Sequence, residues 1–211
     1  MRLASRLAAP EPGWTARADV VVVGSGIAGL TAALHLRTRV PRVLLVTKGE
    51  LASGSTVWAQ GGIAAALDPD DSPAAHKTDT LVAGGGVCDP AAVDVLVTEG
   101  PARVRELVAR GARFDTEPDG ELSLTREGGH HADRIAHAGG DATGAEISRA
   151  LVAQLDAVRS DPGIEVIEHA LVLDLLTAAP DADGRPGPVC GVTLHVIGKG
   201  TRDGVGAALG R

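Results

Sequence analysis

The sequence has very few aromatic residues. Its 211 residues include two tryptophans, one phenylalanine and no tyrosine, about 1% of the chain. Alanine, valine and leucine must therefore fill the core, and the chain offers no aromatic platform for stacking nucleic-acid bases. Basic residues are not in excess either, since the formal net charge is -7. A phosphate backbone requires a basic face, so nucleic acid is not expected as a partner.

Cysteine is nearly absent, and long apolar runs are missing. Cys88 and Cys190 are far apart and form no C-x-x-C motif, which argues against a disulfide framework or a zinc site. We expect both to be small buried thiols. No apolar run is long enough for a signal peptide or a bilayer span, so we expect a cytoplasmic protein without membrane contact. Residues 1–18 are expected to form a flexible N-terminal tail.

The chain does contain enough apolar material for a core, because 44% of its residues are hydrophobic. Its strongest local pattern is the apolar run Asp19–Val23, a glycine-rich turn at Gly24–Gly29 and a helix-period segment at Leu30–Arg37. Val43–Val46 supplies a second apolar run. This order predicts a βαβ unit of an α/β fold, Rossmann-like, with parallel strands.

Later segments are expected to form further helices, a hairpin and an antiparallel β-meander. Helices are expected over residues 73–83, over 90–110 with Gly111 as C-cap, and over 145–159. The hairpin is expected over 114–125 and the meander over 164–197, whereas residues 199–211 are expected to form no further element. The chain appears as one domain that stops before it is complete.

The motif Gly24-x-Gly26-x-x-Gly29 has a physical role in nucleotide binding. Its glycines allow a tight turn and a close approach of backbone N–H groups to a pyrophosphate, and a helix N-terminus then faces the negative charge. The position between a strand and a helix favours a dinucleotide site over a chance turn. The usual ribose-binding acid is replaced by Thr47 and Lys48. A hydroxyl or an ammonium group could act there, and ordinary NAD binding is disfavoured.

A second glycine-rich stretch covers residues 53–62. Ser55, Thr56 and Gln60 offer hydrogen-bonding groups for a flavin or a sugar edge, and the small residues permit close approach. A surface loop of the same composition is the alternative. The order of the two stretches favours a flavin.

The stretch SLTREGGHH, residues 123–131, places Glu127 between Arg126 and a glycine pair. A surface ion pair with Arg126 or Arg134 is one interpretation of Glu127, and a ligand-binding role is the other. Arg126 could also pair with a substrate carboxylate, or it could be structural.

The polar segment that follows has two further interpretations to weigh. A metal site is disfavoured because the spacing of its acids and histidines matches no common site; these residues are His130, His131, Asp133, His137 and Asp141. The histidines are better explained as substrate-positioning or solvent-facing loop residues. The sequence DATG, residues 141–144, is expected to cap a helix through Asp141 or Thr143.

Five segments together resemble the L-aspartate oxidases, a family of FAD enzymes within the succinate dehydrogenase and fumarate reductase flavoproteins. They are GSGIAGL, GSTVWAQGGIAAAL, DTLVAGGGVCD, LTREGGHH and HAGGDATG, in the family's order and approximate spacing. The resemblance implies an FAD-binding domain, incomplete, over residues 19–198. In the family a capping domain with further substrate-binding residues follows, and this sequence does not contain it.

The resemblance also implies site residues. Many family members carry a histidine bonded covalently to FAD where this chain has Ser55, so non-covalent FAD is expected here. Glu127 stands where the dicarboxylate enzymes usually have phenylalanine, and a carboxylate there would orient the substrate ammonium. The cofactor-binding residues expected are Gly24, Ser25, Gly26, Ile27, Ala28, Gly29, Lys48, Ser55, Thr56, Val57, Trp58, Ala59, Gln60, Gly61 and Gly62.

The function implied is FAD-dependent oxidation of L-aspartate to iminoaspartate, with oxygen or fumarate as electron acceptor. In the family this step begins de novo NAD biosynthesis, and quinolinate synthase uses the product. Two alternatives are open: a non-catalytic FAD-binding fragment without the capping domain, and a soluble flavoenzyme that reduces fumarate or oxidises succinate.

Overall fold

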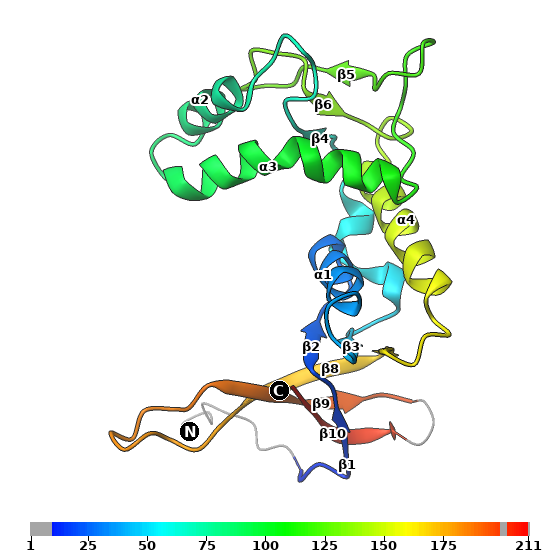
Figure 1. Cartoon of the computed structure of the whole chain (residues 1–211), viewed down its shortest axis with the longest axis vertical. Coiled ribbons are helices and arrows are strands. Elements are labelled where there is room, and N and C mark those ends of the chain that lie inside the picture. The colour runs from blue at the N-terminus through cyan, green and yellow to red at the C-terminus, as the bar shows by residue number, and fades with distance from the viewer. Residues whose placement is uncertain (1–9, 199–201, 211) are drawn as a thin grey trace, which may run out of the picture. The chain divides into compact units, whose positions relative to one another are not determined.

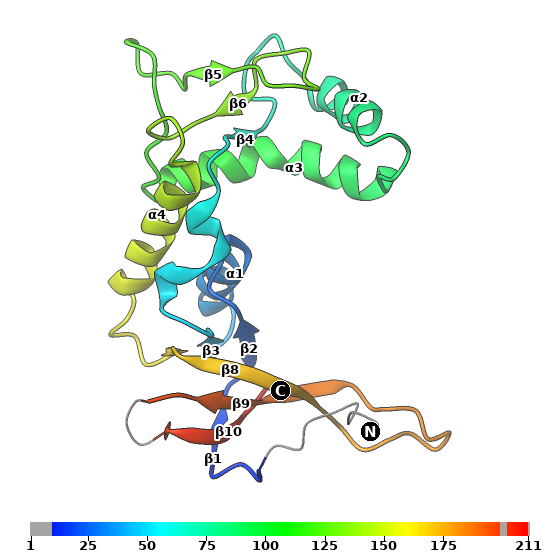
Figure 2. The same ribbon diagram turned by 180° about the vertical axis from the view of Figure 1, so that it is seen from behind.

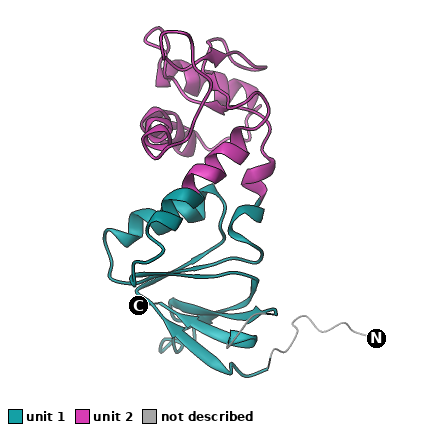
Figure 3. Ribbon diagram, turned by 90° about the vertical axis from the view of Figure 1, so that its right-hand side faces the viewer, with its two compact units in different colours: residues 1–54, 152–211 teal, residues 55–151 magenta. Residues whose placement is uncertain are grey.

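The computed structural model describes residues 10–198 and 202–210. It divides the chain into two compact units, coloured separately in Figure 3. Unit 1 comprises residues 1–54 and 152–211, and unit 2 comprises residues 55–151. The described part of the chain contains no helix long and apolar enough to cross a membrane.

Unit 1 contains the predicted βαβ unit. Strands β2 (Val20–Val23) and β3 (Val43–Val46) pair in parallel, and α1 (Ile27–Arg37) connects them (Figure 1). All residues of β3 are at most 1% exposed. Strands buried on both faces are expected in a parallel sheet, and this burial explains the unbroken apolar run in the sequence.

A third strand extends this sheet, and it corrects the predicted meander. Strand β7 (Ile164–Ile167) pairs in parallel with β3 rather than antiparallel with the strand that follows it. The antiparallel part comprises β8 (Ala170–Thr177), β9 (Val189–Val196) and β10 (Gly204–Leu209), visible from behind in Figure 2. Only the later portion of residues 164–197 therefore belongs to the meander.

The two expected tails are also corrected, because each contributes a strand. Strand β1 (Trp14–Arg17) pairs in parallel with β10, which completes a four-stranded sheet in the order β1-β10-β9-β8. A side chain at Gly206 would overlap the ring of Trp14. Backbone pairing and this ring contact stabilise β1 and β10, although the composition of these segments predicts no strand. Residues 1–9, 199–201 and 211 of the expected tails lie outside the described residues.

The core of unit 1 is built from small aliphatic side chains, as the scarcity of aromatic residues requires. One buried cluster joins β3 with the four-stranded sheet, and it contains Leu44, Val46, Leu194, Val196 and Ala208 among others. Leu30, Ala33 and Leu34 of α1 are also buried.

Unit 2 consists of helices α2 (Pro73–Ala83) and α3 (Pro90–Ala109) and a small sheet of β4 (Ile63–Ala64), β6 (Ile135–Ala136) and β5 (Leu124–Thr125). Two short 3-10 helices, η1 (Leu51–Ser53) and η2 (Ser55–Trp58), lie at the boundary between the units. Helix α4 (Thr143–Ala157) contains the second boundary.

The helix predictions in this part are confirmed by their caps. Ser72 accepts a backbone hydrogen bond at the start of α2, and Asp89 does so at the start of α3. The C-cap of α3 is Arg110 rather than the predicted Gly111, and Gly111 follows it with a φ of 93°, the left-handed conformation in which a glycine commonly ends a helix. The hairpin near Gly120 is reduced to a single bridge between Thr116 and Leu122. Cys88 and Cys190 are partly exposed, which corrects the expectation of buried thiols.

Candidate functional site

The first part of the site is the glycine-rich turn in unit 1. Gly24 has a φ of 101°, and its N–H donates to the carbonyl of Val46 at 2.8 Å. A side chain at Gly29 would place its Cβ 1.8 Å from the carbonyl oxygen of Gly24. Only glycine therefore lets α1 pack this close to the turn, which is the role that the fingerprint assigns to its last glycine.

The N-terminus of α1 has no side-chain cap. Gly26 occupies the N-cap position, and the first turn has no acidic residue. The positive end of a helix dipole and the backbone N–H groups of a glycine-rich turn favour a phosphate. The backbone of this turn therefore fits the pyrophosphate of a dinucleotide.

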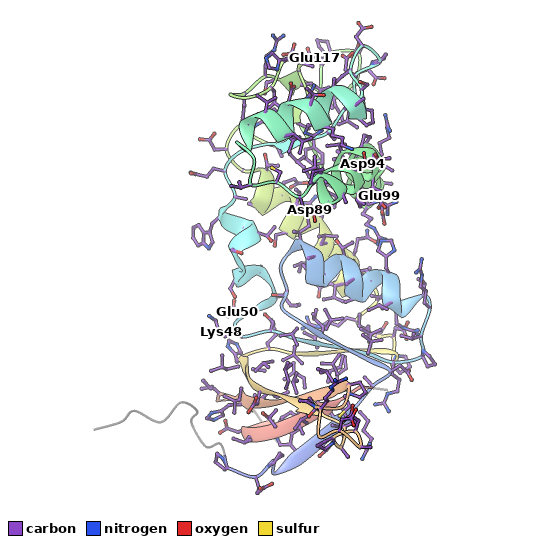
Figure 4. All side chains as sticks on the ribbon, turned by 90° about the vertical axis from the view of Figure 1, so that its left-hand side faces the viewer. Lys48, Glu50, Asp89, Asp94, Glu99 and Glu117 are labelled. Atoms are coloured by element: carbon purple, nitrogen blue, oxygen red, sulfur yellow. The ribbon has the colours of Figure 1, made fainter. Side chains whose placement is uncertain are left out.

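Two buried hydroxyl groups form a hydrogen bond between the turn and the end of β3. Ser25 Oγ and Thr47 Oγ1 lie 2.8 Å apart, and both residues are buried. The side chain of Ser25 is thus engaged by Thr47, and Ser25 could serve a ligand only through its backbone. Lys48 is exposed on the loop after β3, where Figure 4 shows it next to Glu50. Of the Thr47–Lys48 pair, only Lys48 can reach a ligand with its side chain.

The second part of the site is the segment Ser55–Gly62 in unit 2. It begins as η2, and Trp58 is 78% exposed. The first turn of α4 holds this segment, because Gly144 N–H donates to the carbonyl of Ala59 at 2.9 Å. A Cβ at Gly144 would lie 1.9 Å from the carbonyl oxygen of Thr56. Gly144, which the sequence analysis placed only within the DATG cap, is therefore needed for this contact.

Thr143 does not cap α4 in the way that the sequence predicts. The hydroxyl of Thr143 accepts the N–H of Ala138 at 3.1 Å instead of an N–H of its own helix, and Asp141 is exposed. The sequence DATG thus joins the start of α4 to the chain before it. Gly144 then brings the helix against residues 56–59.

Glu127 lies in the loop after β5. Its side chain is 51% exposed, and its Oε1 is 3.4 Å from Nε2 of His137. Neither arginine considered from sequence pairs with it: Arg126 binds Asp133, and Arg134 binds Asp71 and Asp79. The structure therefore does not support the interpretation of Glu127 as an arginine ion pair.

A buried network anchors this loop, and no local sequence pattern indicated it. Arg134 is fully buried and bonds Asp71 through two nitrogens and Asp79 through a third, each at 2.8 Å. Asp79 also accepts the N–H of His131 at 3.0 Å and lies 2.6 Å from its ring Nδ1. The bond from the His131 N–H, with the ring and Arg134, lowers the pKa of Asp79 to about 2.

The histidines form no metal site in this arrangement. Within residues 10–198 and 202–210, no group of three or more His, Cys, Asp or Glu side chains is placed to hold a metal ion. His76 is buried with its ring centroid 5.6 Å from that of His130. Burial lowers the pKa of His76, and the charge of Arg134 adds to this effect.

Comparison with known proteins agrees with this geometry. The FAD binding domain family matches residues 19–207. The chain belongs to this family. The predicted cofactor, FAD, is thereby confirmed, as is the predicted α/β fold with its FAD-binding domain.

Individual proteins similar to this chain are more specific than the domain family. The chain is 63% identical over 202 residues to an L-aspartate oxidase of Streptomyces coelicolor, which covers 96% of this chain and 33% of that protein. A Mycobacterium smegmatis Sdh1 complex contains a similar chain, with a TM-score of 0.81 and 31% identity over 93% of this chain and 33% of the other. The E. coli quinol fumarate reductase chain FrdA has a TM-score of 0.79 and 28% identity, covering 93% and 32%. The family resemblance seen in the sequence is confirmed, and this chain spans about a third of the length of such relatives.

Proposed function

We propose that the protein carrying this chain oxidises L-aspartate to iminoaspartate with FAD. The observation that carries the proposal is the half-exposed carboxylate of Glu127, which the neighbouring arginines leave unneutralised. A carboxylate in this state can bind the α-ammonium group of an amino acid, whereas succinate has no such group. The 63% identity to a Streptomyces coelicolor L-aspartate oxidase supports the same substrate.

Different segments of this chain would bind different parts of the cofactor. The backbone of Gly24–Gly29 would bind the pyrophosphate at the N-terminus of α1, and Lys48 would add a positive charge. Residues Ser55–Gly62 would contact the flavin without a covalent bond. FAD, when bound, supplies the acceptor for the hydride from the substrate α-carbon. The protein supplies orientation and electrostatics.

The physiological setting is part of the proposal. Oxygen or fumarate would accept the electrons, and the reaction would be the first step of de novo NAD biosynthesis in the cytoplasm. Iminoaspartate would pass to quinolinate synthase. The similarity to the E. coli quinol fumarate reductase chain FrdA supports fumarate as one acceptor.

A flavoenzyme acting on succinate or fumarate is the second candidate. The TM-scores of 0.81 and 0.79 with the Sdh1 complex chain and with FrdA favour it. Glu127 argues against it, because a carboxylate left without an ammonium partner disfavours a substrate that carries only carboxylates.

The first experiment follows the flavin absorbance of the purified protein after FAD is added and free flavin is removed. We expect the retained band to bleach under anaerobic conditions with L-aspartate and not with succinate. Bleaching with succinate alone would favour the second candidate. A retained band that responds to neither substrate would indicate an FAD-binding protein without oxidase activity.

Glu127→Gln tests the residue that carries the proposal. The substitution keeps the shape and removes the charge, so we expect kcat/KM for aspartate to fall roughly 10- to 100-fold relative to that for succinate. Glu99→Gln is the matched control, because Glu99 is an exposed glutamate of α3 in the same unit (Figure 4). An unchanged preference for aspartate in Glu127→Gln would refute the role of Glu127.

A further inference from the structure

His137 directly follows β6, and its ring contacts Thr125 of β5 and Glu127 of the loop after β5. Thr125 pairs with Ile135, so His137 is its diagonal neighbour across the β5–β6 ladder. Glu127 lies two residues after Thr125, and His137 lies two residues after Ile135. The ring Nε2 of His137 lies 3.0 Å from Thr125 Oγ1 and 3.4 Å from Glu127 Oε1. One ring nitrogen thus contacts both a hydroxyl and a carboxylate.

The same ring lies against the end of the proposed flavin segment. Ile63 pairs with Ala136 in the β4–β6 ladder, whose two strands are labelled in Figures 1 and 2. Gly62 and His137 are the chain neighbours of this pair. A Cβ at Gly62 would lie 3.0 Å from Cε1 of the His137 ring. His137 therefore stands between Gly62 and Glu127. Its side chain is 20% exposed, compared with 81% for that of His131.

The contact with Glu127 is directional. An ionised carboxylate only accepts hydrogen bonds, so the contact is favourable when Nε2 carries a proton. The ion pair of Glu127 with His137 is formed through Oε1. A contact at Oε1 restricts the direction of the carboxylate, and Oε2 is then the oxygen that would meet a ligand.

We propose that His137 is a positioning residue that determines specificity for an amino-dicarboxylate. It holds Oε1 of Glu127 so that Oε2 meets the α-ammonium group of the ligand. The proposal rests on the proposed function of Glu127. Loss of His137 would release a half-exposed side chain whose rotamers must then be ordered by the ligand, so the ammonium contact would weaken.

The test measures binding without turnover. Succinate and L-2-methylaspartate, which lacks the α-hydrogen, are titrated calorimetrically into the FAD-loaded protein. The readout is the ratio of their dissociation constants. The two ligands differ by the ammonium group and one methyl group, so the effect on the ammonium contact is taken from the change in this ratio between variants. The variants are His137→Ala, His137→Gln, Glu127→Gln and the double variant. His195→Ala is the control, because this exposed histidine of β9 belongs to unit 1, whereas Glu127 and His137 belong to unit 2.

We expect His137→Ala to reduce the ratio about fivefold, as for the loss of an ion pair at a partly exposed site. Glutamine can place an amide nitrogen near the position of Nε2, so His137→Gln should restore most of the preference. In the Glu127→Gln background, His137→Ala should change the ratio by less than about twofold, because the two residues act as one unit. His195→Ala should keep the wild-type ratio.

An unchanged ratio in His137→Ala, or an equal fall in both backgrounds, would overturn the proposal. If His137→Ala does not retain FAD, His137→Gln is compared with His137→Asn instead. Asparagine is too short to reach Glu127, so its ratio should be lower than that of His137→Gln. Equal ratios in these two variants would overturn the proposal. A wild-type protein that does not prefer L-2-methylaspartate would instead refute the proposed function.

Discussion

Gly29 shows how a single missing side chain shapes the nucleotide turn. The carbonyl oxygen of Gly24 occupies the space where a Cβ at position 29 would lie. Helix α1 can approach the end of β2 only because this space is free. The position of the helix N-terminus, and hence of any phosphate bound there, depends on this one contact.

Gly29→Ala should therefore impair both folding and cofactor binding. An overlap of this size must push the helix from the strand, and we expect a loss of about 3 kcal/mol in the free energy of unfolding. Retained FAD after desalting and the thermal melting temperature are the measurements. Gly13→Ala is the control, because its Cβ would meet only the Val205 carbonyl oxygen at 3.7 Å. Equal flavin content in the two variants would contradict this account.

At the scale of elements, α2 and the loop that carries Glu127 are joined by charge. Asp79 on α2 receives bonds from His131 and Arg134, and Arg134 also binds Asp71 ahead of the helix. These side chains are nearly inaccessible, with exposures of 0% for Arg134, 2% for Asp71 and 8% for Asp79. Breaking such a buried set leaves an unpaired charge, so each partner is costly to remove.

Asp79→Asn tests this link through stability and its dependence on pH. At pH 7 we expect a loss of roughly 3 kcal/mol in the free energy of unfolding, because Arg134 loses a charged partner. The folded pKa of Asp79, about 2, lies below the ordinary value of 3.8. The carboxylate therefore contributes stability above pH 3.8 that is lost as the pH falls toward 2.

The variant lacks this contribution, so its stability should fall less than that of the wild type across the same pH range. Urea unfolding followed by circular dichroism at pH 7, 4 and 2.5 would measure both effects. Asp94→Asn is the control, since Asp94 is 59% exposed and pairs with Lys77 at the surface. An equal fall for wild type and Asp79→Asn between pH 4 and 2.5 would contradict the role assigned to Asp79.

The elements also show where the sequence was informative. Helices α2 and α3 and the βαβ unit were predictable because caps, periodicity and apolar runs are local signals. Strand β10 is rich in glycine and alanine, which have a low propensity for strands. It forms because it pairs with β9 and β1. The partner of β7 is β3, which lies far away in the chain. No local pattern specifies such a choice.

The same reasoning applies to the candidate site. The glycine turn and Glu127 stood out because each has a recognisable local pattern. The sequence named His137 only within a group of loop histidines, Gly144 only within a helix cap, and Arg134 only as a partner for Glu127. The contacts that define their roles join segments far apart in the chain.

For the whole molecule, the two tryptophans report on different units. Trp14 in unit 1 is partly buried, donates to the carbonyl of Arg202 at 3.1 Å and has the Arg202 guanidinium 5.4 Å from its ring centroid. Trp58 in unit 2 is 78% exposed. Unfolding therefore changes the surroundings of Trp14 far more than those of Trp58.

We expect Trp14→Phe to abolish most of the red shift in tryptophan emission on urea unfolding. Trp58→Phe should keep the shift, with the same midpoint as the wild type. Fluorescence and circular dichroism of both variants are the measurements. A shift that is lost in Trp58→Phe and kept in Trp14→Phe would contradict the burial assigned to these two rings.

The pairing of Trp14 with Gly206 also has a consequence for synthesis on the ribosome. Residues 55–151 leave the exit tunnel before the partner strand of β1 has been made. The nascent chain therefore presents an unpaired β1 while unit 2 already has its full sequence, and free strand edges favour association between chains. The four-stranded sheet closes late, so slow translation of residues 152–209 would prolong the interval in which chaperones are needed.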